Sequence, residues 1–315
     1  MPNSATTFAL SESVHQQARR LSWGQTYSQI GLGPFSGSFS SSDSGTIQFF
    51  VERMNREVWQ SGQVPENKIG FGIPTHVGSN SYLCGERVDV GQLLVFSGAS
   101  GFEFLSPQNF SFCGIEMDSD EINDGKLRQL TTELRRVFSC SRRAITFNAE
   151  ERRVLSASFD SVYRRTIDAE SLLAPADDTQ VKALNRQMVG TVLDCLHDDS
   201  HELVQVVKHW EIVTHIRDLV KFNPQCPRTV AELTIEVGLS RRTLQNACRD
   251  ILDVSPVQFL RLLRLNEVRQ SIETASSVTD AATEYGFWHL GYFSRDYRKM
   301  FGEAPSTTLE RYRRK

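Results

Sequence analysis

Five side chains that can hydrogen-bond to nucleobases or phosphates lie within one short segment: Arg241, Arg242, Gln245, Asn246 and Arg249. Arginine pairs bidentately with guanine O6 and N7, and asparagine or glutamine pairs with adenine N6 and N7. Any arginine can also hold a phosphate. If the segment is helical, Leu244 lies on the inner face and the five polar side chains face outward. The pattern therefore predicts a helix that recognises DNA.

The residues before this helix predict how it is positioned. Gly238 tolerates the left-handed backbone that ends one helix and turns the chain. Thr234, four residues earlier, is short enough to let two helices approach closely. Ser240 can cap the second helix by accepting a hydrogen bond from an amide of its first turn. Together these features indicate a helix-turn-helix motif.

The same pattern occurs a second time, because Gly286 follows Gly238 by 48 residues and Ala282 again lies four before it. A single copy is equally compatible with a helical hairpin that has a solvated polar face. Two copies favour DNA binding. The segment 256–272, with Pro256 behind Ser255, predicts a rigid connecting helix. Such a helix would set the spacing of the two recognition helices near one DNA turn, about 34 Å.

These motifs together resemble the AraC/XylS family of bacterial transcription regulators. The resemblance lies in Gly238-Leu-Ser240, Val254-Ser-Pro256, Phe259-Leu260, Arg264-Leu265, Gly286-Phe287, residues 292–295, Phe301-Gly302 and Pro305-Ser306. Residues 240–247 and 286–291 are most similar to ethanolamine-operon regulators of that family, and residues 71–75 and 101–107 extend the resemblance weakly upstream. The family resemblance implies an effector domain that controls DNA binding or contact with RNA polymerase. It also implies ethanolamine and a cobalamin as effectors, although no cofactor is required.

By resemblance, Arg242, Gln245 and Asn246 contact bases from the first motif, and Leu290, Gly291 and Arg295 do so from the second. The sequence departs from the family pattern at Thr234, Cys248 and Gly291, and the last of these puts base recognition by the second motif in doubt. Arg295, Arg298 and Lys299 could instead anchor phosphates. The expected DNA-binding residues are Arg241, Arg242, Gln245, Asn246, Arg249, His289, Leu290, Gly291, Ser294, Arg295, Arg298 and Lys299.

Length and charge agree with a two-domain protein. The chain has 315 residues, 39% of them hydrophobic, which is more than a single hydrophobic core usually supports. Residues 240–315 hold 13 Lys and Arg against 9 Asp and Glu, whereas the rest of the chain is acidic. The six cysteines have no paired short spacing, which argues against a zinc site or disulfides. With no export signal and no long apolar run, the expected location is the cytoplasm, away from membranes.

The N-terminal part predicts strands and then helices. Aromatic and branched residues alternate in short runs between residues 45 and 118, which is typical of an antiparallel barrel or sandwich. The Ser- and Gly-rich stretch 35–45 is expected to be a loop. Apolar residues three or four apart predict helices at 127–138, 149–173 and 179–197.

The expected fold class is α+β, with a cupin-like β-barrel and flanking helices followed by an all-α domain that holds both helix-turn-helix motifs and their linker helix. The expected domains are residues 1–200 for effector sensing or dimerisation, with a barrel at 35–118 and helices at 124–197, then a linker at 201–207, and DNA binding at 208–315.

The N-terminal domain has two interpretations that the sequence leaves open. A small barrel can hold one small molecule, for which Trp59, Phe71, Phe102 and Phe104 are candidate pocket residues, although each taken singly fits an ordinary core aromatic better. The alternative is a module that only dimerises or binds a protein partner. Promoter DNA, RNA polymerase, the effector and a second copy of the chain are the expected partners.

Enzymatic interpretations have little support in the sequence. The seven histidines form no His-x-His or His-Glu-x-x-His group, so neither a catalytic metal nor any other metal site is expected. No phosphate-binding loop, nucleophile elbow or dinucleotide fingerprint occurs. The sequence therefore predicts a DNA-binding regulator, most simply an activator of a catabolic operon, rather than an enzyme.

Overall fold

The computed structural model describes residues 5–43, 45–76, 78, 80–97, 101–118, 125–139, 144–166, 178–196, 208–222 and 229–313. The chain divides into an N-terminal unit, Met1–Tyr27 with Ser36–Gln205, and a C-terminal unit, Ser28–Phe35 with Val206–Lys315. The expected linker at 201–207 lies outside the described residues. Within the described part of the chain, every helix is too short or too polar to span a membrane.

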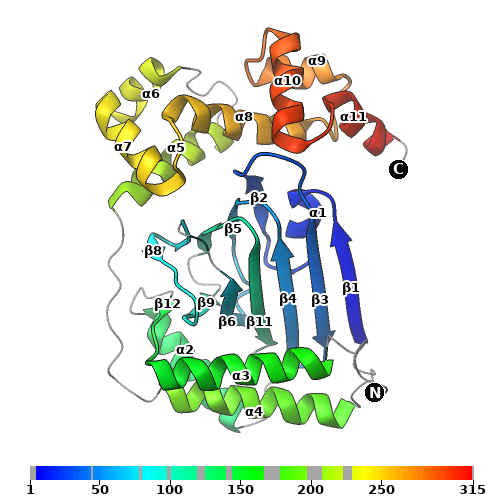
Figure 1. The fold of residues 1–315 in the computed structure, drawn as a ribbon, viewed down its shortest axis with the longest axis vertical. Coiled ribbons are helices and arrows are strands. Elements are labelled where there is room, and N and C mark those ends of the chain that lie inside the picture. The colour runs from blue at the N-terminus through cyan, green and yellow to red at the C-terminus, as the bar shows by residue number, and fades with distance from the viewer. Residues whose placement is uncertain are drawn as a thin grey trace. The chain divides into compact units, whose positions relative to one another are not determined.

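The N-terminal unit is built on two sheets (Figure 1). The larger has seven strands in the order β1-β3-β4-β11-β6-β9-β12, and the smaller has five in the order β2-β5-β10-β7-β8. The strand bounds are β1 Ala5–Ser11, β2 Thr26–Gln29, β3 Gly37–Asp43, β4 Ile47–Met54, β5 Val58–Gly62, β6 Lys68–His76, β7 Tyr82–Leu83, β8 Glu86–Arg87, β9 Leu93–Ser97, β10 Phe102–Ser106, β11 Phe110–Asp118 and β12 Ala144–Ile145. Both sheets have free edges, so the described strands form no closed barrel and the expected cupin-like barrel is not confirmed.

The Ser- and Gly-rich stretch after Phe35 is a strand rather than the expected loop. Strand β3 pairs antiparallel with β1 on one side and with β4 on the other. Ser40, Ser41 and Ser42 are buried, and the Ser41 hydroxyl lies 2.8 Å from that of Thr7. Pairing on both edges and the small size of serine thus override the loop preference of the sequence.

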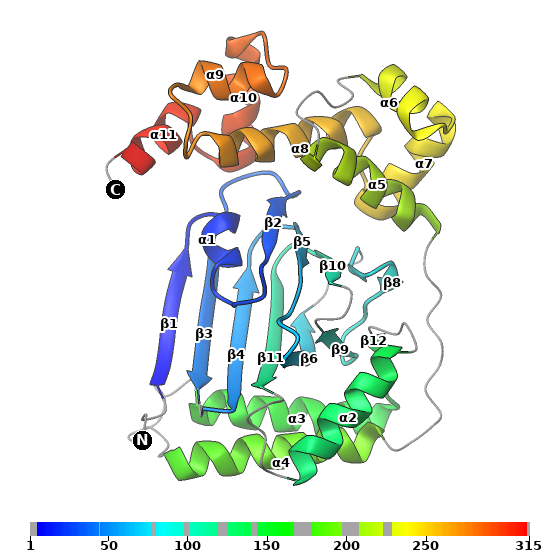
Figure 2. The same cartoon turned by 180° about the vertical axis from the view of Figure 1, so that it is seen from behind.

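Helices α2 Gly125–Ser139, α3 Ala149–Thr166 and α4 Asp178–Leu196 lie together beside the larger sheet (Figure 2), and their apolar side chains pack on one of its faces. Odd-numbered strand residues such as Phe49, Phe71 and Ile115 form a fully buried core with Phe159 and Val192 of the helices. Successive side chains of a strand point to opposite faces of the sheet, so the residues that face the helices all have odd numbers. The three helices expected from apolar spacing are confirmed, although residues 167–173 of the second lie outside the described part.

Even-numbered residues of the larger sheet form the opposite, aromatic face. Phe50 and Phe96 lie there, and the ring of Trp23 packs against them at centroid distances of 5.9 and 5.3 Å. Gly70 and Gly114 make this packing possible, since a Cβ at either would lie within 2.4 Å of the Trp23 or Phe50 ring. This aromatic core belongs to the N-terminal unit alone.

The C-terminal unit is helical. Its elements are α5 Lys208–Phe222, α6 Val230–Val237, α7 Arg241–Leu252, α8 Pro256–Ser271, α9 Val278–Glu284, α10 Leu290–Phe301 and α11 Pro305–Arg313. Helix α8 is buried on several sides, with Phe259, Leu263 and Val268 each at most 3% exposed. An all-α domain with a central connecting helix was expected from residues 208–315, and these helices confirm it.

Residues 28–35 also pack on α8 and α10, and no pattern in the sequence predicts this contact. The side chain of Asn266 accepts a hydrogen bond from the Gln29 amide and donates one to the Gln29 carbonyl, both at 2.8 Å. The Gln29 side chain donates to the Met300 carbonyl at 2.8 Å, and the Gly33 amide donates to the same carbonyl at 3.0 Å. The C-terminal unit therefore includes a short piece of chain from near the N-terminus.

Candidate nucleic-acid interface

The first helix-turn-helix motif consists of α6 and α7. The Thr229 hydroxyl caps α6 by accepting from the Glu232 amide at 3.2 Å, and the helix ends at Gly238, whose φ is +67°. A φ in this range favours glycine, which explains why the turn occurs there. The Ser240 hydroxyl caps α7 by accepting from the Thr243 amide at 3.1 Å. The cap and the turn expected from the sequence are confirmed.

Helix α7 has a buried face and a polar exposed face. Leu244, Ala247, Cys248 and Ile251 are completely buried. The residues expected to contact DNA are all exposed: Arg241, Arg242, Gln245, Asn246 and Arg249. Their guanidinium and amide groups can therefore reach base edges or phosphates without moving the helix.

The second motif consists of α9 and α10. Its turn contains Gly286, with a φ of +77°, and its second helix buries Phe293 and Tyr297. His289, Leu290, Gly291, Arg295, Arg298 and Lys299 are exposed, and Ser294 is half-buried. A Cβ built on Gly291 meets no atom within 4 Å, so the space beside this residue is open and a side chain would fit there.

The basic residues of α10 have different surroundings. The guanidinium of Arg295 lies 5.0 Å from the centre of the Tyr292 ring and 3.8 Å from Asp296. Lys299 lines a separate pocket with Ile30 and Leu32 of the C-terminal unit. Arg295 is therefore held near the first turn of α10, whereas Lys299 lies beside the 28–35 segment.

Helix α8 joins the two motifs rigidly. Ser255 and Gln258 form a capping box at its start, where Pro256 occupies the first turn. Near its other end, the Arg269 guanidinium donates to Glu303 at 2.9 Å and lies 4.5 Å from the centre of the Phe301 ring. Glu303 also accepts from Arg311 at 2.6 Å, so this end of α8 is tied to both α10 and α11.

The four candidate effector residues do not form one site. Phe102 and Phe104 line a small cavity of about 10 Å³ in the aromatic core of the N-terminal unit. Phe71 lies in the helix-covered core instead. Trp59 is buried, and its indole N–H donates to Glu103 at 2.6 Å. The structure thus brings together two of the four.

Polar side chains that were not predicted from the sequence also line this cavity. Gln60 is 3% exposed, and its Nε2 is a buried donor without a hydrogen-bond partner. The Glu52 carboxylate accepts from Gln17 at 3.0 Å and from Tyr27 at 3.1 Å. Burial raises the pKa of Glu52 to about 7, against the lowering effect of these two hydrogen bonds. A signal for Glu52 existed in the sequence, because it alternates with Phe50 and Met54 on an otherwise apolar strand face.

Comparison with known proteins agrees with the geometry of the C-terminal unit. A family model described as a helix-turn-helix domain matches residues 233–311. The probable thc operon regulatory protein of Rhodococcus erythropolis is 33% identical over 96 residues, which is 29% of each chain. A XylDLEGF operon transcriptional activator of Pseudomonas putida is 35% identical over 102 residues, covering 31% of this chain and 30% of that protein. The matches therefore span less than a third of these curated relatives.

Among solved structures, a probable AraC family transcriptional regulator from Rhodopseudomonas palustris is similar to part of this chain. The two are 35% identical, with a TM-score of 0.30, and the match covers 32% of this chain and 97% of that one. The sequence identity extends over nearly all of that chain. The C-terminal part of the protein is therefore a helix-turn-helix domain of the AraC family.

Proposed function

We propose that this protein is a sequence-specific DNA-binding transcription regulator that activates a catabolic operon. The observation that carries the proposal is the capped helix α7 with Arg242, Gln245 and Asn246 exposed along one side. A second motif is held by the buried helix α8, so two adjacent major-groove segments of a promoter can be bound at once. The relatives reported above are named as an operon regulatory protein and an operon activator. Contact with RNA polymerase is the corresponding route to activation.

We infer that the N-terminal unit senses a small molecule. The supporting observation is the unpartnered Nε2 of Gln60 in an aromatic cavity, since a buried donor without an acceptor costs free energy that a ligand oxygen would recover. A cavity of about 10 Å³ holds roughly one water, so an effector would enter only if the surrounding aromatic side chains move. Ethanolamine and a cobalamin are the first compounds to test.

Self-association is a second candidate function of the N-terminal unit. Strand β1 lies at the edge of the larger sheet, and its Phe8 and Leu10 are 67% and 66% exposed. An edge strand with exposed apolar side chains is a ready surface for pairing with another strand. Sedimentation analysis of the chain and of its Phe8→Lys variant distinguishes a dimer through β1 from a monomer.

Replacing Arg242 or Gln245 by alanine is expected to weaken binding to the specific site by about 1 to 3 kcal/mol and to relax preference at one or two base pairs. Both side chains are exposed on α7, so neither change should disturb the core. Competition binding against randomised sites measures the effect. Equal losses of affinity for specific and for random DNA would show that these residues contact only phosphates.

Replacing Gln60 by leucine is expected to abolish the response to the effector without lowering stability. The change removes a buried donor that has no partner, so the free energy of unfolding should stay constant or rise. A reporter assay with a metabolite panel measures the response, and Gln63→Leu on the exposed surface is the matched control. An effector response that survives Gln60→Leu would place the ligand elsewhere.

A further inference from the structure

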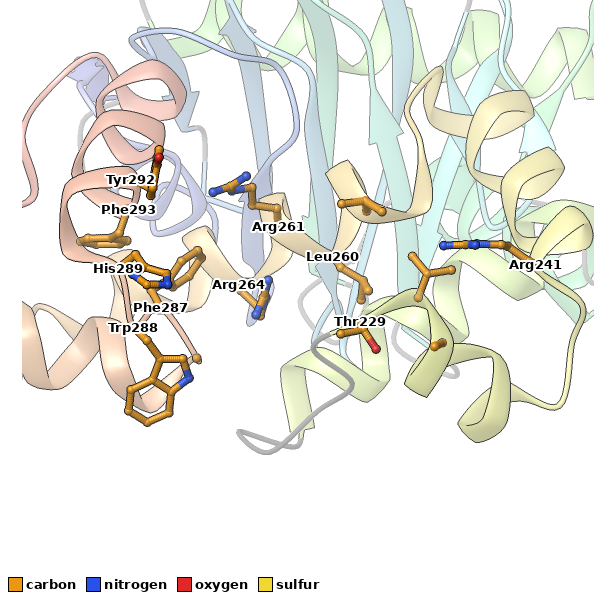
Figure 3. Close-up of a pocket in the computed structure, with 14 residues that line it drawn as sticks. Thr229, Arg241, Leu260, Arg261, Arg264, Phe287, Trp288, His289, Tyr292 and Phe293 are labelled. Carbon is orange, nitrogen blue, oxygen red and sulfur yellow. The ribbon is translucent and has the colours of Figure 1, made fainter.

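A cleft of about 520 Å³ lies in the C-terminal unit between the two helix-turn-helix motifs (Figure 3). We call it the inter-motif cleft. Its floor is helix α8, with Leu260 and Arg264. One side is formed by Thr229 and Arg241 of the first motif, and the other by residues 286–289 and Tyr292 of the second. Both recognition helices thus border the cleft with their first turns.

The charge of the cleft is complementary to DNA. Its described lining includes Arg241, Arg261 and Arg264 and no acidic side chain. Arg261 is paired with Asp296, and the guanidinium of Arg264 lies 5.0 Å from the centre of the Phe287 ring. An arginine positioned against an apolar ring attracts a phosphate more strongly than one in open water, because the local dielectric constant is lower. The cleft therefore favours an anionic partner.

Apolar side chains at the cleft are unusually exposed. Val257, Trp288 and Tyr292 have exposed fractions of 57%, 64% and 59%. Large apolar groups gathered at one place on a surface mark an interaction site. Arginines interleaved with such groups are the combination that minor-groove binding proteins use, the arginines against the backbone and the apolar groups against sugars or base steps.

The position of the cleft determines which groove of the DNA it would contact. When two recognition helices occupy major-groove segments about one turn apart on one face of DNA, the minor groove faces the protein midway between them. The cleft lies between α7 and α10 at the residues next to Arg242 and Leu290. It is therefore continuous with the candidate DNA interface and faces the centre of the site.

We propose that the inter-motif cleft binds the minor groove at the centre of the DNA site, with Trp288 and Tyr292 against its walls and Arg241 and Arg264 at its phosphates. This inference rests on the proposed binding of DNA by both motifs. A narrow minor groove of A·T pairs has the more negative potential, and guanine places a 2-amino group in the groove. The cleft therefore gives the protein a preference for A·T pairs at positions that the recognition helices do not read.

The test uses the full chain and a site selected from random DNA, whose central base pairs are A·T, G·C or inosine·C. Inosine lacks the 2-amino group of guanine but keeps its major-groove edge, so it separates the two grooves. We expect G·C at the centre to lower affinity about tenfold relative to A·T, and inosine·C to restore it. Equal affinity for the three sites would overturn the proposal.

The variant Trp288→Ala should lose about tenfold in affinity for the A·T site and should no longer discriminate against G·C. Ile235→Ala is the matched control, because Ile235 is an exposed apolar residue of the first motif that does not line the cleft. Thermal unfolding checks that both variants are folded. If Trp288→Ala keeps the discrimination of the unmodified protein, the cleft does not bind the groove.

Arg242→Ala separates this inference from the proposed function. It should lower affinity for all three central sequences equally and leave the preference for A·T and inosine·C intact. Suppose that Arg242→Ala weakens binding to all three sites as expected, while Trp288→Ala changes neither the affinity nor the preference for A·T. The proposed function as a DNA-binding regulator would then stand, and the cleft would be excluded as a DNA-binding surface. Equal losses of Arg242→Ala on specific and random DNA would instead contradict sequence recognition by α7.

Discussion

Inserting about five base pairs between the two major-groove segments of the DNA site is expected to weaken binding by about 2 to 5 kcal/mol. Half a turn moves the second segment to the opposite face of the DNA, where α10 cannot reach it. The estimate is half of the difference of about 4 to 10 kcal/mol between specific and non-specific binding, because one motif would still make its contacts. Titration and footprinting on the two sites measure the loss.

The physical basis of this prediction is the rigidity of α8. Phe259 and Val268 are completely buried, and Arg269, Glu303 and Arg311 tie the helix to α10 and α11. Bending such a helix would expose apolar area and break the partly buried ion pairs of Glu303 with Arg269 and Arg311. The DNA, rather than the protein, would then have to deform.

An insertion of the same length outside both segments is the control and should leave affinity unchanged. If the insertion between the segments is tolerated, either the motifs are flexibly joined or only one of them binds sequence-specifically. Comparing Arg242→Ala with Arg295→Ala decides between these explanations. A loss with Arg242→Ala alone would fit the exposed backbone at Gly291, where no side chain is presented.

The second large effect is expected from Glu52→Gln, which should stabilise the protein at pH 8 by about 3 kcal/mol more than at pH 4. Burial raises the pKa of Glu52 from 4.5 to about 7 in the folded chain. Below pH 4.5 the Glu52 carboxyl is protonated in both the folded and the unfolded state, so its ionisation does not lower the free energy of unfolding. Between pH 4.5 and 7 only the unfolded state releases the proton, so the stability of the natural protein falls as the pH rises.

The substitution is conservative, because a glutamine Oε1 can accept the same hydrogen bonds from Gln17 and Tyr27. Urea unfolding of both proteins at several pH values measures the difference. Tyr27 is the titratable group that contacts Glu52, and it ionises far above this range because its pKa is raised by burial. Exposed Glu66→Gln is the control. A stability difference that does not change between pH 4 and 8 would contradict a protonated Glu52 in the folded state.

Local chemistry explains why the C-terminal unit could be predicted so closely. Ser240 and Ser255 cap the starts of α7 and α8 through their own side chains, and Gly238 and Gly286 supply the left-handed backbone that follows α6 and α9. Each of these effects involves residues within a few positions of one another. The face of α7 that carries Arg242 and Gln245 follows in the same way from the spacing of its buried residues.

Residues far apart in sequence decided the features that were missed. Strand β3 exists because β1 and β4 pair with it, although its serines and glycines favour a loop. Phe102 and Phe71 are both aromatic residues of strands, yet one lines the small cavity and the other packs under the helices. Alternation along a strand predicts which residues share a face, but not what covers that face.

Local sequence patterns were enough to predict the two helix-turn-helix motifs, the helix between them and the exposed polar face of α7, because caps, turns and helical spacing act over a few residues. Only the tertiary structure showed the Gln29 contact with Asn266, which lies 237 positions away in the chain. The burial of Glu52 and the cleft between Arg241 and Trp288 likewise arise from packing. Such contacts depend on how whole elements meet, and no local pattern encodes that.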